Sequence, residues 1–266
     1  MVTGGLSVRR ACALSQIHRS TFHYIAHPND DTALLTQIRE LAAQHPRYGY
    51  RRISVLIRRK EQVNQKRVRR LWRLHRLQVR RVRRKRTRRA RPQRLQAAYV
   101  GHIWAYDFVE DALADGTPLR ILTVMDEFTR EGLAIDVALT TSAQRVLCVL
   151  SALFAQHGAP AYLRSDNGAE FVATAVQSWL AESGVQTLYI EPGKPWQNGK
   201  EERFNGTVRD ECLNLHLFSS VAEACVRLGA FRHHYNIERP HSALDYLTPL
   251  AFKAAWFEAQ AKVQDS

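Results

Sequence analysis

The sequence predicts a small all-α region followed by an α/β domain with a mixed, five-stranded sheet and flanking helices. Before residue 94, apolar residues recur at helical spacing among many basic side chains, whereas short runs of β-branched and aromatic residues dominate after it. Three such runs follow one another, and later runs alternate with helical patterns, which is typical of helices packed on a mixed sheet. We therefore expect two domains, 1–94 and 95–266, the second ending in a helical extension.

The first domain is expected to hold only helices. Two short helices around a turn fit residues 7–25, a weak helix-turn-helix signal that a generic helical hairpin matches about as well. Capping residues precede the next helix, and Pro46 follows its end. The expected helices after the first pair are 32–43, 51–59 and 64–80.

The second domain is expected to alternate strands and helices after an initial run of strands. Strand patterns occur at 102–109, 119–127, 133–138, 162–165 and 187–190. Helical patterns occupy 142–157, 169–182, 197–215 and 220–236. A ribonuclease-H-like fold has this order, although periodicity alone allows other mixed-sheet folds.

Basic charge is concentrated in one segment. Residues 47–94 hold 22 Lys or Arg and one acid, Glu61, while the rest of the chain holds 17 basic and 24 acidic residues. Such a segment attracts a polyanion by displacing its condensed counterions, so nucleic acid is the expected partner. A solvated surface usually mixes both signs, which this segment does not. Residues 81–94 are expected to form an Arg-rich linker, and the candidate DNA contacts in this region are Arg69, Arg70, Arg73, Arg80, Arg81, Arg83 and Arg84.

Several other classes of protein fit poorly. The longest apolar run is too short to span a bilayer, and the first residues do not resemble a secretory signal, so we expect a cytoplasmic protein at the bacterial nucleoid and no membrane partner. The cysteines lack close pairing, which favours reduced thiols over disulfides or zinc. The histidines near the end have no cysteine at ligand spacing, so a zinc role is not expected for His233, His234 or His241.

Two aspartates stand where a sheet could present them to a ligand. Asp107 interrupts an apolar strand, and alternation puts it on the face of Ile103, Ala105 and Val109. Asp166 follows the strand 162–165, and open α/β sheets bind ligands at the carboxyl ends of their strands. A turn or helix-capping aspartate is the alternative for Asp166.

A third acid is expected on the helix 197–215, at Glu201 or Glu202. Glu202 lies about 200° around the helix from Phe204 in the apolar stripe, whereas Glu201 lies about 60° from it. Glu202 therefore points away from the stripe, on a face that it shares with Asn198, Asn205 and Arg209. An ordinary solvated glutamate is the alternative.

Three motifs together resemble a known family. They are Trp-Ala-Tyr-Asp at 104–107, Ser-Asp-Asn-Gly at 165–168, and Pro-Gly-Lys-Pro-Trp-Gln-Asn-Gly-Lys-Glu-Glu-Arg-Phe-Asn at 192–205. They closely resemble the IS-three family of insertion-sequence transposases, within the retroviral-integrase superfamily. Thirty-five residues separate Asp166 from Glu202, which matches the family's spacing and selects Glu202. Glu201 departs from the pattern, since an apolar residue is expected there.

The resemblance extends over essentially the whole chain. Residues 32–91 resemble the family's helix-turn-helix region, and 235–241 with 248–249 resemble its ending. It implies a ribonuclease-H-like integrase catalytic core, and a DNA transposase that performs metal-dependent cleavage and strand transfer at the ends of an insertion sequence. It also implies that Asp107, Asp166 and Glu202 bind two Mg²⁺ (or Mn²⁺) ions. A nuclease of the same fold without strand transfer and a non-catalytic DNA-binding regulator or inactive copy are the alternatives.

The resemblance also suggests supporting residues and partners. Arg209, Lys200 and Lys194 are expected to contact DNA. The residues expected to shape the site are Asn167, Gly168, Asn198 and Gly199. Asp126 and Glu170 are acids from which we expect milder losses on substitution. The chain looks like the second reading-frame product of its element, so the implied partners are the element ends, target DNA, further copies of the chain on DNA, and the upstream reading-frame protein.

Overall fold

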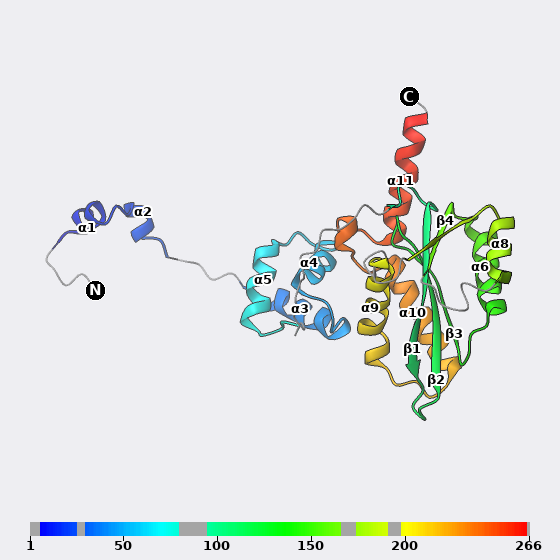
Figure 1. Ribbon diagram of the computed structural model, residues 1–266. Coiled ribbons are helices and arrows are strands. Elements are labelled where there is room, and N and C mark those ends of the chain that lie inside the picture. Colours follow the sequence, from blue (N-terminus) through cyan, green and yellow to red (C-terminus); the bar gives the residue numbers. More distant parts are fainter. Residues whose placement is uncertain (1–5, 26–29, 80–94, 166–173, 191–197, 265–266) are drawn as a thin grey trace.

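A computed structural model describes residues 6–25, 30–79, 95–165, 174–190 and 198–264 of the chain (Figure 1). The order of elements follows the sequence prediction. The strands are β1 Ile103–Ala112, β2 Pro118–Asp126, β3 Gly132–Ala138, β4 Tyr162–Ser165 and β5 Gln186–Tyr189. The helices are α1 Val8–Leu14, α2 Arg19–Phe22, α3 Thr32–Gln44, α4 Tyr50–Arg58, α5 Gln65–Leu74, α6 Ala143–His157, α8 Thr174–Glu182, α9 Glu201–Glu211, η2 Leu213–Leu215, α10 Val221–Ile237, η3 Ser242–Leu244 and α11 Pro249–Gln264.

The five strands form one mixed sheet in the order β3-β2-β1-β4-β5. The strands β1, β2 and β3 are antiparallel neighbours, and Asp107 on β1 lies opposite Thr123 on β2. The strand β4 runs parallel to β1, with Ala105 opposite Arg164, and β5 runs parallel to β4. This sheet confirms the predicted fold class.

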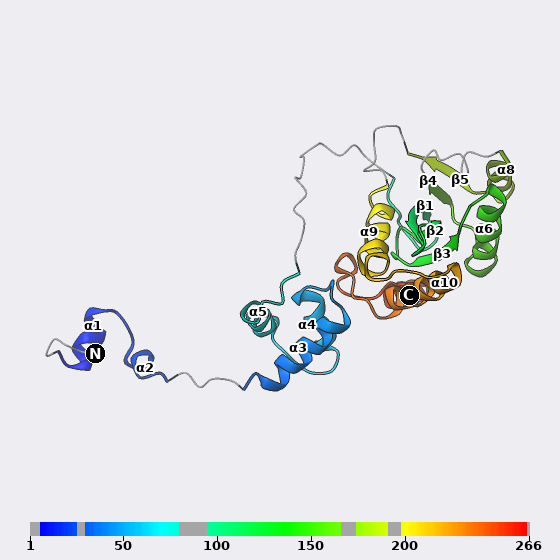
Figure 2. The ribbon, with the colours of Figure 1, turned by 90° about the horizontal axis from the view of Figure 1, so that it is seen from below.

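Helices cover both faces of the sheet (Figure 2). Alternation along β1 sends Ala105 and Val109 into an apolar cluster with α9 and α10, and sends Trp104 and Tyr106 into a second cluster with α6 and α8. Asp107 shares the face of Ala105 and Val109, as the sequence predicted, and the structure shows that this face packs against α9. We call residues 95–264 of the described chain the sheet domain.

The helix α9 is held on the sheet by a buried stripe. Phe204, Val208 and Cys212 recur every four residues and are buried in the cluster of α9 and α10. The sequence predicted a helix as far as residue 215, but the α-helix ends at Glu211. Cys212 leaves helical geometry with φ −132° and ψ −67°, and a short 3₁₀ turn at η2 then buries Leu213.

The helices α3, α4 and α5 share a separate apolar core that includes Ile38, Ile53, Val68 and Trp72. We call residues 30–79 the helical unit. Its last helix was predicted to reach residue 80, but α5 ends at Leu74 because Arg76 turns the chain with φ +54°. The backbone N–H of Leu77 then donates to the carbonyl of Trp72, a helix-ending bond of the Schellman type.

The ends of the described chain are helical, as expected. The short helices α1 and α2 begin after the capping side chains of Ser7 and His18. At the other end, α11 packs its aromatic residues Phe252 and Trp256 against Phe128. The proposed domain boundary at residue 94 falls in 80–94, outside the described residues. Within the described ranges, no helix combines the length and apolarity needed to cross a membrane.

Candidate active site

Asp107 lies in the middle of β1 with its half-buried carboxylate turned toward α9. One oxygen, Oδ1, accepts a hydrogen bond from the backbone N–H of Phe108 over 2.8 Å. The other oxygen, Oδ2, accepts from the side-chain amide of Asn205 over 3.1 Å. Asp107 is therefore held in one direction by a residue of α9.

Glu202 lies in the first turn of α9 and its side chain is exposed. It stands one turn before Asn205, and residues three apart on a helix share a side. A carboxylate in this turn is favoured by the helix dipole. Glu202 thus occupies the flank of α9 that meets β1 at Asp107, away from the buried stripe, as the helical spacing predicted.

Asp166, the third predicted acid, lies outside the described residues. The strand β4 ends at Ser165, which is buried and immediately precedes Asp166 in the sequence. Eight further candidates also lie outside the described residues: Asn167, Gly168, Glu170, Lys194, Arg80, Arg81, Arg83 and Arg84. In the part of the chain that the structure describes, no group of three His, Cys, Asp or Glu side chains is arranged to hold a metal ion.

Glu201 is fully buried beside Asp107, in contrast to its exposed neighbour Glu202. Its Oε1 lies 2.8 Å from the hydroxyl of Thr123, and this hydroxyl also lies 2.8 Å from Oδ1 of Asn205. Burial raises the pKa of the Glu201 carboxyl well above its ordinary value, and the negative charges of Asp107 and Glu127 add to the rise.

The number of hydrogen atoms on Glu201, Thr123 and Asn205 indicates the direction of the hydrogen bonds among them. Thr123 has one hydroxyl hydrogen, which can be donated to only one acceptor at a time. A protonated Glu201 eases the shortage, because it donates to Thr123, whose own hydrogen then goes to Asn205 at 2.8 Å rather than to the more distant backbone carbonyl of Asp107 at 3.2 Å. The amide of Asn205 completes the chain by donating to Asp107. Glu201 is therefore best understood as a neutral, buried group behind Asp107.

A buried ion pair braces the turn after β2. The guanidinium of Arg164 donates to Glu127 Oε1 over 2.6 Å, and both side chains are almost wholly enclosed. Lys200, just before α9, pairs with the other oxygen of Glu127 at 3.2 Å and donates to the Glu127 carbonyl. These contacts give Lys200 a structural role, so its predicted contact with DNA would have to be made alongside them.

The other described candidates have varied surroundings. Arg209 is exposed, and its guanidinium donates to the backbone carbonyl of Glu110 on β1 over 3.0 Å. Asn198 is buried in the turn before α9, and its Oδ1 has no hydrogen-bond partner among the described residues. Gly199 follows it, half-buried. On the helical unit, the exposed candidates on α5 are Arg69, Arg70 and Arg73.

Asp126 and His241, for which the sequence predicted no essential catalytic or zinc-binding role, have structural partners. Asp126 is buried at the end of β2 and accepts hydrogen bonds from the backbone N–H groups of Gly101, Phe128 and Thr129. Among the histidines, His241 is buried and its Nε2 lies 3.1 Å from the carbonyl of Tyr235.

Sequence reasoning missed two residues that support Asp107. Thr123 was not singled out, because a threonine in a strand is ordinary. Thr123 lies opposite Asp107 across β1 and β2, but this pairing can be recognised only once the register of the sheet is known. Asn205 was placed on the correct face of its helix, but its contact with Asp107 depends on how α9 packs on the sheet.

Comparisons with known proteins agree with the fold and with the division into a helical unit and a sheet domain. Residues 98–195 and 183–249 match models of the integrase core domain, and residues 28–86 match an HTH-like domain. The catalytic core domain of HTLV-2 integrase, solved in complex with magnesium, superposes with a TM-score of 0.50 at 14% identity, covering 59% of this chain and 99% of that structure. The fold and these matches define an integrase-type polynucleotidyl transferase.

Relatives among insertion elements narrow the class. The chain is 42% identical over 254 residues to the 31.7 kDa protein of insertion element IS407 from Burkholderia multivorans, covering 94% of this chain and 91% of that protein. It is 28% identical over 238 residues to transposase InsD of insertion element IS2 from Escherichia coli, covering 83% and 78% of the two chains. The chain belongs to the IS-three family of insertion-sequence transposases, as a second reading-frame product, and acts on DNA.

Proposed function

We propose that this transposase cuts and joins DNA at the ends of its insertion sequence with Asp107, Asp166 and Glu202 as the catalytic, metal-binding acids. The observation that carries the proposal is the hydrogen bond from Asn205 to Asp107. It brings the flank of α9 that bears Glu202 against the strand that bears Asp107. The parallel pairing of β4 with β1 supports the third assignment, since Asp166 is the next residue after β4.

The described acids suit a hard divalent cation such as Mg²⁺ or Mn²⁺. Magnesium favours a few carboxylates with water and substrate phosphate over a cage made wholly by protein. Glu202 is exposed, and the half-buried carboxylate of Asp107 is turned toward α9, where it accepts from the amide of Asn205. When bound, two such ions would activate the attacking oxygen and stabilise the charge on the entering and leaving oxygens.

The residues of this chain contribute position and charge. Asn205 fixes the direction of the Asp107 carboxylate, and the neutral Glu201 supports Asn205 through Thr123 without adding a negative charge. Arg209 lies further along the same flank of α9, where its guanidinium could meet a DNA phosphate. Water attacks a phosphodiester at the element end, and the freed 3′-hydroxyl attacks a second phosphate. No covalent bond to the protein is needed.

Several features of the assembly belong to the same proposal. Both element ends must meet for transposition, so we expect copies of the chain to assemble on DNA. The upstream reading-frame protein of the element is the expected protein partner. The exposed arginines of α5 are expected to contact DNA phosphates, and binding should weaken steeply with salt. Because its substrate is DNA, we expect the protein in the cytoplasm, at the nucleoid.

The test is a joining assay. The purified protein, with and without the upstream protein, is incubated with a labelled element end, Mg²⁺ and a supercoiled plasmid. Joined products are expected. Cleavage without joining would mean a nuclease of the same fold, and retention of DNA without cleavage would mean a regulator or an inactive copy.

Matched variants test the residues. We expect Asp107→Asn, Asp166→Asn and Glu202→Gln each to abolish joining while DNA binding persists. Asp111→Asn is the control, because Asp111 also lies on β1 and also accepts from the backbone N–H that follows it. Full joining by any of the three variants would refute the assignment of that residue.

A further inference from the structure

A shared carboxylate joins the helical unit to the sheet domain at the end of α9. The guanidinium of Arg239 donates to both oxygens of Glu211, each over 2.7 Å, and the two side chains are 5% and 10% exposed. Arg52, on α4 of the helical unit, donates to Glu211 Oε1 over 3.2 Å. A bidentate pair of this kind is geometrically specific. Glu211 is thus anchored by the sheet domain and contacted by the helical unit.

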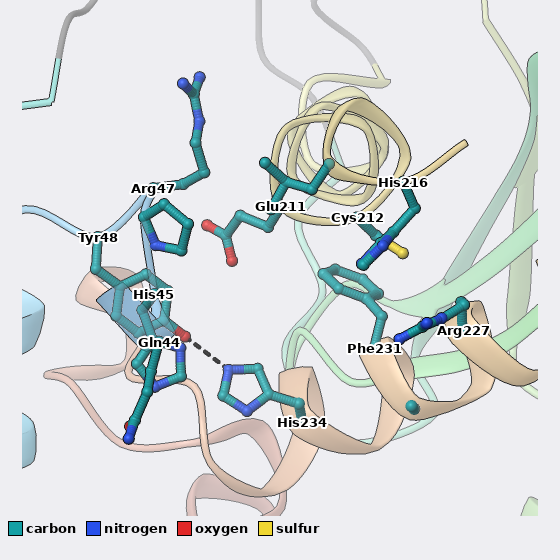
Figure 3. Close-up of a pocket in the computed structure, with 13 residues that line it drawn as sticks. Gln44, His45, Arg47, Tyr48, Glu211, Cys212, His216, Arg227, Phe231 and His234 are labelled. Carbon is teal, nitrogen blue, oxygen red and sulfur yellow. Dashed lines mark hydrogen bonds between the residues drawn. The ribbon is translucent and has the colours of Figure 1, made fainter. Parts of the chain in front are cut away.

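Aromatic rings and imidazoles lie beside this carboxylate (Figure 3). The hydroxyl of Tyr48 lies 2.9 Å from Nε2 of His234 on α10. The ring of His45 stacks on the rings of Tyr48 and His234, with distances between ring centroids of 4.5 Å and 5.1 Å. Arg52 lies over the Tyr48 ring at 5.1 Å. Tyr48 is only 2% exposed: it belongs to the apolar core of the helical unit, and its hydroxyl reaches His234 of the sheet domain.

Two further contacts extend the interface. Arg47 pairs with Asp210, the residue before Glu211, and Arg59 donates to the carbonyl of Glu238 over 3.0 Å. A cavity of about 300 Å³ lies between the two parts and is lined from both sides. The contacts are mainly polar and leave space, so the interface is specific but not tightly packed.

The helix α9 links this interface to the candidate active site. Its first turn carries Glu202 and its last turn carries Asp210 and Glu211. Nine residues of α-helix span about 13.5 Å as a stiff rod. Between its ends, Asn205 and Arg209 bond β1 at Asp107 and Glu110. A displacement at the Glu211 end therefore reaches the acids at the other end.

We infer that Glu211, contacted by Arg52 and supported by the pair of Arg47 and Asp210, is a positioning residue that fixes the helical unit relative to the active site. This inference rests on the function proposed above. DNA held by the basic helical unit would then be presented to Asp107 and Glu202 in one orientation. The docked arrangement is the productive one.

A charge swap at Arg47 and Asp210 is the sharpest test. Both side chains are partly exposed, so the variants should fold. Arg47→Asp places a third acid beside Asp210 and Glu211, and Asp210→Arg opposes Arg47. We expect each to lower the rate of joining at saturating DNA by about tenfold or more, as misplacement of reacting groups does. Asp210→Arg adds positive charge and should not weaken DNA binding. The double variant should recover joining to within about twofold of wild type.

The docking itself is followed separately by hydrogen–deuterium exchange at residues 45–52. Each single variant should speed exchange there, and the double variant should restore protection. Arg52→Ala should act like the single variants, whereas Arg58→Ala is the control, since Arg58 is an exposed arginine of the same helix. Arg52→Lys, which keeps the charge, should rescue part of the rate.

Other results would overturn the inference. Wild-type joining by a single variant whose 45–52 segment exchanges faster would mean that docking does not position the active site. Faster joining would mean that the docked state is inhibitory. A double variant no better than the single variants would remove the role of the pair. If the wild-type protein fails to join DNA, the proposed function falls and the coupling falls with it, while the exchange data still report whether the two parts dock.

Discussion

The side-chain amide of Asn205 on α9 donates a hydrogen bond to Oδ2 of Asp107 on β1 over 3.1 Å, and its carbonyl oxygen lies 2.8 Å from the hydroxyl of Thr123. The two ends of the amide thus have partners of different kinds, which fixes its orientation. Because Asp107 accepts on its other oxygen from the backbone, its carboxylate has one preferred direction. The direction of the Asp107 carboxylate is therefore set in part by a neutral side chain on the facing helix.

Replacing Asn205 should reduce catalysis more than stability. In Asn205→Ala the Asp107 carboxylate loses a donor to a charged group, an interaction of about 1.5–3 kcal/mol. We expect joining to slow by roughly 10- to 100-fold, measured as the single-turnover rate with preformed protein–DNA complex. Asn205→Asp should be slower still, because it places a second negative charge beside Asp107.

Asn214→Ala is the matched control for Asn205. Asn214 is exposed in the turn after α9, so the Asn214→Ala variant should join DNA at the wild-type rate. A wild-type rate for Asn205→Ala as well would show that the amide does not position Asp107.

Glu201→Gln should stabilise the protein at neutral and alkaline pH. The folded-state pKa of Glu201 is raised above its ordinary value of 4.5 by burial first. Between these two values the folded state holds a proton that the unfolded state has released, so wild-type stability falls as pH rises. Glutamine keeps the shape and a donor for Thr123 but has no carboxyl to ionise. In thermal melts, the melting temperature of Glu201→Gln should exceed that of the wild type by a difference that grows from pH 4.5 to pH 8.

The variant Glu202→Gln distinguishes the role of Glu202 from that of its neighbour Glu201. Glu202 is exposed, so its amide variant should unfold at the wild-type temperature while joining is lost. The opposite pattern, with a pH-dependent gap for Glu202→Gln and none for Glu201→Gln, would show that the burial of the two side chains had been exchanged.

Local patterns in the sequence were sufficient to predict the direction of two acids. Alternation along β1 placed Asp107 on the face of Ala105 and Val109, and that face does pack against α9. Helical spacing placed Glu202 opposite the stripe of Phe204, and the structure leaves it exposed. Both predictions depend only on the two backbone periods, 2.0 and 3.6 residues.

Contacts between distant segments could not be predicted in this way. The neutral Glu201 depends on Thr123, 78 residues earlier, and on the register that pairs β1 with β2. The interface at Glu211 depends on Arg52, 159 residues earlier. The sequence placed Arg52 in a basic region suited to DNA, and nothing local distinguishes an arginine that binds phosphate from one that binds a carboxylate. The end of α5 at Leu74 could not be predicted from the local pattern either, because basic residues continue beyond it.

The pair of Arg164 and Glu127 should be important for stability. Arg164→Met would leave the fully buried carboxylate of Glu127 without its guanidinium partner, although Lys200 still pairs with it. Breaking a buried pair by removing one partner costs about 3–5 kcal/mol, measured by urea denaturation. The double variant Arg164→Met/Glu127→Leu should recover part of that loss, because it removes the fully buried carboxylate and leaves only the loss of its pair with the partly exposed Lys200.

An exposed pair offers the comparison. Arg145 bonds Asp136 in a bidentate pair whose side chains are 44% and 25% exposed. Arg145→Met should cost no more than about 1 kcal/mol. Equal losses for the two arginines would show that burial does not make the difference.

Gly132, at the start of β3, should tolerate no side chain, because α9 passes too close. A Cβ atom there would lie 2.8 Å from Cζ of Phe204, and both backbone polar groups of Gly132 are already bonded to the side chain of Asn236. Gly132→Ala must therefore displace the Phe204 ring, at a cost of about 1–3 kcal/mol. Joining should slow as well, since Glu202 and Asn205 lie on the same helix.

Gly229→Ala shows what the same substitution does without a clash. Gly229 lies exposed within α10, and a Cβ atom there meets nothing within 4 Å. Alanine should raise stability by up to about 1 kcal/mol through helix propensity. A second change can test the cause at Gly132, because Phe204→Leu makes room for the new methyl group. If the close approach is responsible, Gly132→Ala should cost less in the Phe204→Leu background than in the wild type, whereas an equal cost in both backgrounds would place the strain elsewhere.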